Sequence, residues 1–173
     1  MTDIEHCTVR PYRDTDSDVV RSLIAELQDT LRVLDTHLPR GEEMADAYLT
    51  YTFEHCRMHD GRILLAEVRG AVVAFATVLN RLPFESPDSP TGHFAYLMDL
   101  GVRAAFRGRG IGSALMAAAE EVARSAGALE FRTLVLHGNR AVNLYRRCGM
   151  TDYSLTLRKR LDNLDAMPPS SSS

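Results

Sequence analysis

The sequence predicts a single α/β domain built on one mixed β-sheet that is flanked by helices. Two helical patterns follow the first strand-like segment, three strand-like segments come next, and helix and strand patterns then alternate. Hairpins give antiparallel neighbours and helical crossovers give parallel ones, so the sheet should contain both directions. A chain of 173 residues is long enough to bury a core without disulfides or a structural metal.

Composition excludes several classes of protein. A formal net charge of -3 argues against a nucleic-acid partner, and no apolar run approaches the length of a membrane span. The first ten residues carry acids and a histidine where a signal peptide would have a basic start and an apolar run. Three scattered cysteines, Cys7, Cys56 and Cys148, fit neither a disulfide framework nor metal-ligand spacing. We therefore expect a cytoplasmic protein with free thiols, no metal and no membrane partner.

The first sixty residues should form one strand and two helices. The strand is expected over Cys7 to Arg13, and Thr15 with Asp18 resembles the capping box that starts a helix. Apolar residues then recur at helical spacing at Val20, Leu23, Ile24, Leu27, Leu31 and Leu34. A second helix is expected from Glu42 to about His59, with a buried face of Ala45, Tyr48, Leu49, Thr52 and Cys56. Its acidic first turn is explained by the helix dipole better than by a substrate.

The middle of the chain has the pattern of a hairpin followed by a further strand. Ile63 to Val68 and Ala71 to Leu79 are apolar runs rich in β-branched residues, and Arg69-Gly70 between them indicates a tight turn. Arg81 to Gly92 contains three prolines and should be a loop. The next strand is expected over His93 to Val102.

The last third should alternate helix and strand. A helix lined by Ala114, Leu115, Ala118 and Val122 should end at Gly127. A strand is expected over Phe131 to Leu136, a short helix from about Asn139 to Arg147, and a final strand over Tyr153 to Leu157. Residues 1–165 would then form the domain, and residues 166–173, which are rich in proline and serine, should be disordered.

The glycine-rich turn between the strand at His93 to Val102 and the helix after it carries the strongest functional signal. Gly108, Gly110 and Gly112 allow the backbone to turn its N–H groups toward one anion, at a point where a helix begins. Arg107 and Arg109 could add side-chain charge for a phosphate or pyrophosphate. The dinucleotide-binding pattern G-x-G-x-x-G fails here, because Ser113 or Leu115 stands where the third glycine belongs, and no Walker lysine is present.

These motifs resemble the GNAT superfamily of acyl-CoA N-acyltransferases. The resemblance rests on Asp99-Leu100-Gly101-Val102, the R-x-x-G-x-G loop, the stretch from Asn139 to Tyr145, and Cys148-Gly149-Met150, where phenylalanine is more usual than Met150. It covers roughly Val9 to Leu157. It implies that acetyl-CoA is the co-substrate. The residues implied to hold its pyrophosphate are Arg107, Gly108, Arg109, Gly110, Ile111 and Gly112, and the backbone of Leu100 and Val102 is implied to bind its pantetheine arm.

Acetyl transfer to an amine needs a base for the amine and an acid for the departing thiolate. Tyr145 occupies the family's tyrosine position and is the expected general acid, with core packing as its alternative. Asp99 is a candidate base that could equally be a structural partner, and His93, Tyr96 and His137 are its rivals. Asn139 could hold the pantetheine arm, cap the following helix, or do both.

The resemblance implies an N-acetyltransferase that moves an acetyl group from acetyl-CoA directly to a primary amine in a ternary complex. The acceptor would be a small molecule or a peptide. The alternative is a catalytically silent CoA-binding or regulatory module on the same fold, because fold alone does not establish activity. The protein is expected to be either a monomer or a homodimer.

Overall fold

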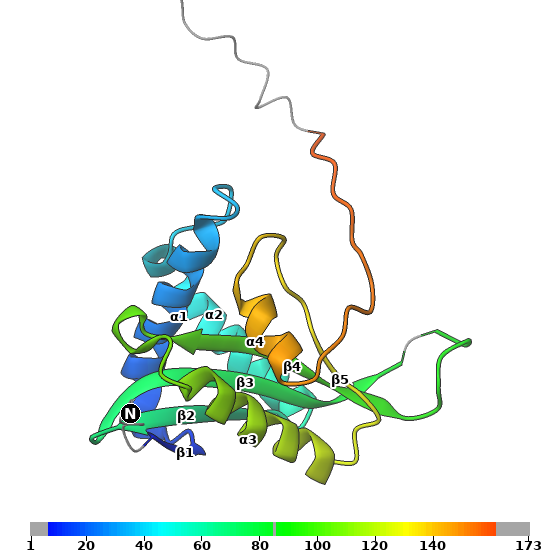
Figure 1. Cartoon of the computed structure of the whole chain (residues 1–173), viewed down its shortest axis with the longest axis horizontal. Helices are drawn as coiled ribbons and strands as arrows, with labels where there is room; N and C mark the ends of the chain where they lie inside the picture. Colours follow the sequence, from blue (N-terminus) through cyan, green and yellow to red (C-terminus); the bar gives the residue numbers. More distant parts are fainter. Residues whose placement is uncertain (1–6, 85, 162–173) are drawn as a thin grey trace, which may run out of the picture.

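The computed structural model describes residues 7–84 and 86–161, which form a sheet between two layers of helices (Figure 1). The strands are β1 (Cys7–Pro11), β2 (Arg62–Val68), β3 (Ala71–Pro83), β4 (His93–Val102) and β5 (Phe131–Thr133). The helices are α1 (Ser17–Arg32), α2 (Gly41–Met58), α3 (Ile111–Ser125) and α4 (Ala141–Arg147), with single 3-10 turns at Asp14–Asp16 and Ala104–Phe106. None of the described helices is long and apolar enough to cross a membrane.

The sheet has the order β1-β2-β3-β4-β5 and is mixed, which confirms the expected fold class. β1 to β4 pair antiparallel, and β5 pairs parallel to β4. Arg69 and Gly70, with φ of 52° and 79°, make the two-residue turn between β2 and β3. β3 continues to Pro83, beyond the expected end at Leu79, because Leu82 and Pro83 still pair with the start of β4.

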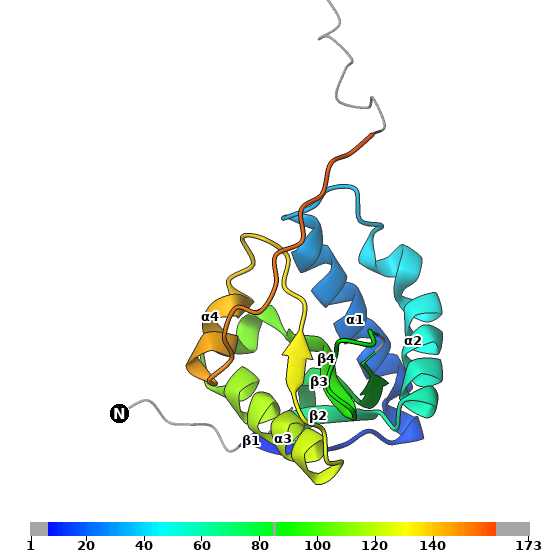
Figure 2. The same cartoon turned by 90° about the vertical axis from the view of Figure 1, so that its right-hand side faces the viewer.

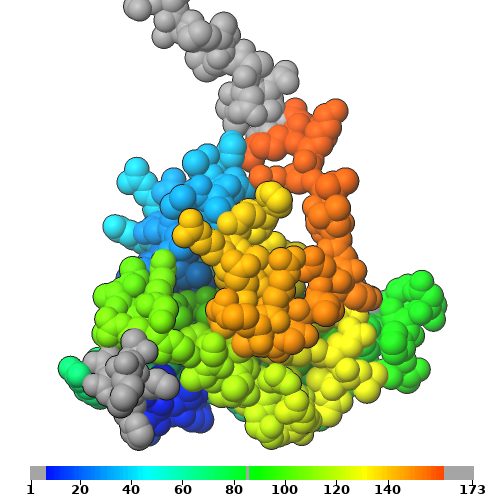
Figure 3. Space-filling model, viewed as in Figure 1, coloured from blue at the N-terminus to red at the C-terminus, as the bar shows by residue number. Residues whose placement is uncertain are grey.

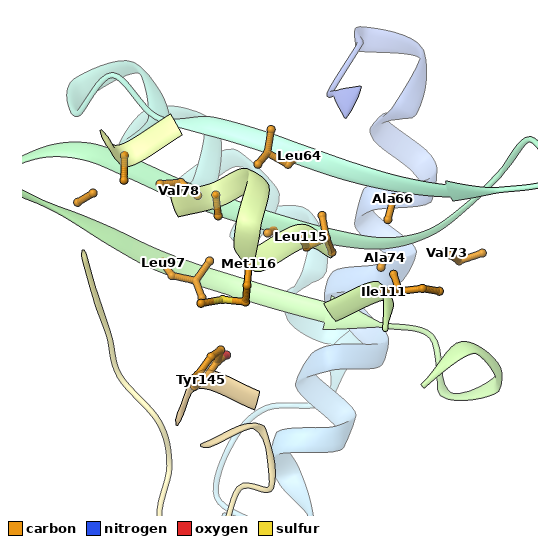
Figure 4. Packing of buried hydrophobic residues seen from close by; sticks show 14 of the residues in the cluster. Leu64, Ala66, Val73, Ala74, Val78, Leu97, Ile111, Leu115, Met116 and Tyr145 are labelled. Carbon is orange, nitrogen blue, oxygen red and sulfur yellow. The ribbon is translucent and has the colours of Figure 1, made fainter. Parts of the chain in front are cut away.

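Each face of the sheet covers its own apolar core. α1 and α2 pack on one face, where Phe75 is fully buried among Leu23, Leu49 and Leu65. α3 packs on the other face, where Leu115 and Met116 meet the sheet, and Tyr145 of α4 joins the same cluster (Figure 4). Figure 2 shows β5 between the α1/α2 layer and the α3/α4 layer. The two helix layers therefore pack on opposite faces of the sheet.

The start of α1 differs from the expected capping box. Asp16, and not Asp18, turns back on the chain and accepts the backbone N–H of Arg13 at 2.8 Å. The Arg10 guanidinium donates to the same carboxylate at 2.7 and 2.9 Å, and this ion pair lowers the pKa of Asp16. β1 accordingly ends at Pro11, and α1 stops at Arg32, which leaves Leu34 41% exposed instead of buried.

The final strand expected over Tyr153 to Leu157 is not formed. This segment is extended and unpaired within residues 7–84 and 86–161, and Tyr153, Leu155 and Leu157 are 76%, 83% and 86% exposed. β5 also ends at Thr133, three residues before the expected Leu136. In Figure 3 the segment after α4 rises away from the body of the molecule. The prediction of a strand here was wrong, because alternation gives the pattern of a strand but not the neighbour it must pair with, and no described strand lies alongside. The tail expected at residues 166–173 is outside the described residues.

Candidate functional site

The centre of the site is the point where β4 and β5 separate. The two strands pair only over Ala95, Tyr96 and Leu97, and the last pair joins Leu97 to Thr133. Beyond the Leu97–Thr133 pair, β4 continues to Val102, and over this part the only described strand that pairs with it is β3. The backbone of β4 is thus open on its β5 side, where a ligand can take the place of a strand.

A β-bulge in β4 decides which side chains face this opening. Asp99 pairs with Thr77, but Leu97 pairs with the next residue of β3, Val78, so Met98 is the extra residue. Without the bulge, Leu97 and Asp99 would point to the same face. With it, Leu97 packs into the α3 core while Asp99 turns toward α2.

Asp99 is a carboxylate buried beside the hydroxyls of Tyr48 and Thr77. The residue is 7% exposed, and Oδ1 accepts a hydrogen bond from the Tyr48 hydroxyl of α2 at 2.8 Å. Oδ2 and the Thr77 hydroxyl are both buried, and neither makes a hydrogen bond of normal geometry within the described chain. Burial raises the pKa of Asp99 to about 6, although the Tyr48 and Thr77 hydroxyls oppose this shift. A carboxylate with such a pKa can exchange a proton near neutral pH.

Tyr145 approaches from the other face. It is 8% exposed and belongs to the core cluster under α3, where Figure 4 shows it below Leu97 and Met116. Burial, and then the negative charge of Asp99, raise the pKa of Tyr145 to about 12. The phenol therefore stays protonated at physiological pH and can serve as an acid.

The glycine loop has the open backbone that the sequence predicts. Gly108 and Gly110 have φ of 76° and 82°, and a Cβ at either position would meet nothing within 4 Å. Gly110 directly precedes α3, whose first-turn N–H groups have no partner inside the helix. These N–H groups and the helix dipole make the loop fit a phosphate or pyrophosphate.

The two loop arginines have different surroundings. The Arg107 Nε donates to the Val102 carbonyl at 2.9 Å, and an Nη donates to Thr30 of α1 at 3.1 Å. Arg109 donates to the Ala105 carbonyl at 3.0 Å and stacks over the Phe106 ring at 5.3 Å. Arg107 thus fastens the loop to α1, and it also uses the Val102 carbonyl that was expected to bind pantetheine.

Other expected site residues have structural roles. Asn139 caps α4, since its side-chain oxygen accepts the Ala141 N–H at 2.9 Å. His93 lies at the far end of β4 and contacts the Ala126 carbonyl at 3.1 Å through Nε2, and His137 is exposed on a loop. Tyr96 remains near Asp99, whose charge helps raise its pKa after burial.

A cavity of about 640 Å³ lies on the α2 side of the sheet, between α2, the end of β3 and the start of β4. Tyr51 and Tyr96 line it, and both also contribute electrostatically to the Asp99–Tyr48 neighbourhood. Sequence reasoning missed this cavity and assigned Tyr48 to the core. A tyrosine in an apolar helical stripe has the same pattern in either role, so no local signal distinguishes them.

The raised pKa of Asp99 predicts a pH-dependent cost to stability. Its carboxyl titrates near 3.8 when unfolded and near 6 when folded, so the folded state disfavours the charged form. Wild-type stability relative to Asp99→Asn should be highest below pH 4 and fall by about 3 kcal/mol as pH rises through 6. Urea unfolding across that range measures this. Asp18→Asn, an exposed carboxylate on α1, is the control, and a pH-independent difference for Asp99→Asn would contradict the assignment.

Comparison with known proteins gives the family. The sequence matches the Acetyltransferase (GNAT) family over residues 23–150. It is similar to the thialysine N-epsilon-acetyltransferase of Mus musculus, with 31% identity over 147 residues that cover 83% of this chain and 84% of the relative.

Two solved structures show the same fold. A GCN5-related N-acetyltransferase from Ralstonia eutropha superposes with a TM-score of 0.72 at 20% identity, covering 91% of this chain and all of that one. The aminoglycoside acetyltransferase AAC(6')-Iy, in complex with a CoA-based bisubstrate analogue, gives 0.65 at 21% identity, covering 90% and 99%. The separated strands, the glycine loop before α3 and these matches lead to one conclusion: the chain belongs to the acetyltransferase (GNAT) family and is an enzyme that transfers an acetyl group to an amine.

Proposed function

We propose that the protein transfers the acetyl group of acetyl-CoA directly to a primary amine while both substrates are bound. The observation that carries this proposal is that Asp99 lies on β4 just beyond its last pair with β5 and faces Tyr48 of α2, while Tyr145 packs in the α3 cluster on the opposite face of the sheet. Asp99 Oδ2 accepts a proton from the amine, whose lone pair then attacks the thioester carbonyl. The C–S bond breaks, and the Tyr145 hydroxyl supplies the proton that the thiolate takes up.

Acetyl-CoA fits the α3 side of the gap between β4 and β5. We assign its pyrophosphate to the loop of Arg107, Gly108, Arg109, Gly110, Ile111 and Gly112, supported by the open backbone at both left-handed glycines and by the start of α3. Its pantetheine arm would follow the unpaired edge of β4 at Leu100 and Val102, with Asn139 at the nearby end of α4. Because the Val102 carbonyl already accepts Arg107, Leu100 is left as the main acceptor on that edge.

Transfer without a covalent enzyme intermediate is supported by the state of the thiol near the site. Cys56 lies on α2, and burial together with the Asp99 charge raises its pKa to about 11. At neutral pH this thiol is protonated and a poor nucleophile. A direct attack by the amine is therefore the simpler route.

For the acceptor we propose a small-molecule or peptide amine. The mouse relative is named for thialysine, an amine-bearing amino acid. The alternative of a silent CoA-binding module is disfavoured, because burying Asp99 disfavours its charged form and so costs stability, and a catalytic role gives a reason to keep such a group. CoA release from acetyl-CoA, measured across a panel of amines that includes thialysine, tests the activity, and no release with any amine would favour the silent module.

The loop assignment predicts that Gly110→Asp abolishes acetyl-CoA binding. The new carboxylate would lie at the pyrophosphate position and repel it, while the Cβ itself meets open space. Gly127→Asp is the matched control, since Gly127 has a φ of 76°, equally open surroundings and a position at the other end of α3. Calorimetry should show lost binding only for Gly110→Asp. Unchanged acetyl-CoA affinity in that variant would contradict the assignment of the pyrophosphate to this loop.

The acid assignment predicts that Tyr145→Phe lowers turnover by roughly 10²-fold while acetyl-CoA affinity stays the same. The ring keeps its packing and only the hydroxyl is lost. Tyr12→Phe removes a tyrosine hydroxyl from the α1/α2 core instead and should leave turnover unchanged. Steady-state kinetics and thermal melts of both variants make the comparison. Full turnover by Tyr145→Phe would reassign the tyrosine to packing.

We also propose that the protein is a cytoplasmic homodimer joined through the segment after α4. Its three cysteines are free, as expected in a reducing compartment. Leu155 and Leu157 are exposed in extended chain, and β5 is the last strand in the sheet order. Every copy thus carries both an extended apolar segment that is unpaired within the described residues and a sheet edge, so two copies can pair reciprocally.

The dimer proposal predicts that Leu155→Asp combined with Leu157→Asp gives a monomer, because charge would have to be buried at the new contact. Light scattering coupled to gel filtration measures the mass. Val33→Asp, at an 82% exposed position after α1, should leave the dimer intact. A wild-type protein that is monomeric at micromolar concentration would reject the proposal.

A further inference from the structure

The cavity on the α2 side has an uneven distribution of charge. At its inner end, Tyr51 and Tyr96 adjoin the Asp99 neighbourhood, where the reacting amine would lie. Its outer wall includes Arg132 of β5, and none of the lining residues is an aspartate or glutamate. A substrate that extends outward from the reacting amine therefore meets a cation and finds no acidic partner in the lining.

Arg132 is held rigidly at this wall. Its guanidinium carbon lies 4.4 Å from the Phe94 ring centre, 5.1 Å from that of Phe84 and 4.7 Å from that of Tyr153. These rings come from β4, from the β3–β4 connection and from the segment after α4. Three aromatic contacts fix the plane of the guanidinium without using its N–H groups. The Arg132 side chain therefore loses little conformational entropy when a ligand binds.

The guanidinium still has hydrogen-bonding capacity. Its Nε donates to Glu130 at 2.7 Å, and this is its only hydrogen bond within residues 7–84 and 86–161. The remaining N–H groups lie on the two Nη atoms, in the planar arrangement that matches a carboxylate. The side chain is 27% exposed, so a ligand in the cavity can reach it.

The histidines and acids near Arg132 already have partners. His55 and His59 also line the cavity, and their Nδ1 atoms contact the carbonyls of Tyr51 at 2.9 Å and Arg81 at 3.3 Å. Asp60 is paired with Arg62 at 2.9 Å, and Glu130 with Arg132 at 2.7 Å.

We propose that Arg132 is the specificity-determining residue of the acceptor site and binds an anionic group of the acceptor, a carboxylate. The acceptor class is then an amine that carries a carboxylate at a distance, as in an amino acid with an amine on its side chain. Polyamines and aminoglycosides are disfavoured, because they would bring a second ammonium to the guanidinium without the carboxylate that accompanies it in an amino acid. This inference rests on the proposed function only in that the amine end lies near Asp99.

The test compares thialysine with its carboxamide, which differ only in the anionic group, and with pentane-1,5-diamine. The wild-type enzyme should favour thialysine over the carboxamide in kcat/KM by roughly 10- to 100-fold, mainly through KM. Arg132→Gln should bring this ratio close to one. Arg81→Gln, an arginine 60% exposed near the same rim, should keep the wild-type ratio.

Calorimetry of the same three compounds with the CoA-bound protein makes the result independent of turnover. The proposal is supported if thialysine binds more tightly than its carboxamide and this preference is lost in Arg132→Gln but kept in Arg81→Gln. Such a result supports the proposal even if no acetyl transfer is detected. The absence of transfer would count against the proposed function alone. Equal binding of the acid and the amide, an unchanged preference in Arg132→Gln, or better use of the diamine would overturn it. Thermal melts of both variants exclude misfolding as the cause.

Discussion

The short parallel pairing between β4 and β5 is the constraint on which the site depends. The strands stay together for three pairs, up to Leu97 and Thr133, and then diverge. If the pairing continued, β5 would take up the backbone hydrogen bonds of β4, and no opening would connect the two faces of the sheet. Because pairing stops, the backbone edge of β4 is open where we propose that acetyl-CoA on the α3 side meets the amine on the α2 side. A longer β5 would give a more regular sheet, but it would leave no opening between the two faces of the sheet.

Burial of Asp99 near the gap between β4 and β5 lowers the free energy of unfolding at neutral pH. A carboxylate buried beside two hydroxyls and no cation disfavours its own ionised form, which explains the direction of its pKa shift. Tyr48 offsets part of this cost with one hydrogen bond to Oδ1. The burial that lowers stability also brings the pKa of Asp99 close to neutral pH, where the base role that we propose for it would need it, as expected where function competes with stability.

Sequence reasoning succeeded where local chemistry determines the outcome. The glycine loop at residues 107–112 needs left-handed backbone ahead of a helix, and this is visible in the residues themselves. It failed where the outcome depends on a distant neighbour. Tyr48 fits an apolar helical stripe whether or not a carboxylate lies opposite, and alternation alone would have put Leu97 and Asp99 on one face. The alternating segment Tyr153 to Leu157 likewise has the pattern of a strand but does not specify the strand beside it.

The loop arginines show how the two halves of the site are joined. Arg107 connects the glycine loop to Thr30, and Glu26 accepts both the Ala104 N–H at 2.7 Å and the Arg103 guanidinium at 3.3 Å. Thr30 and Glu26 belong to α1, which packs against α2 and so supports Tyr48. The loop that faces the co-substrate and the helix layer that faces the acceptor are therefore linked through one helix. Arg107, which we assign to the pyrophosphate site, thus also fixes the glycine loop to α1 through Thr30. The direct transfer that we propose would require such a fixed arrangement of the two substrate sites.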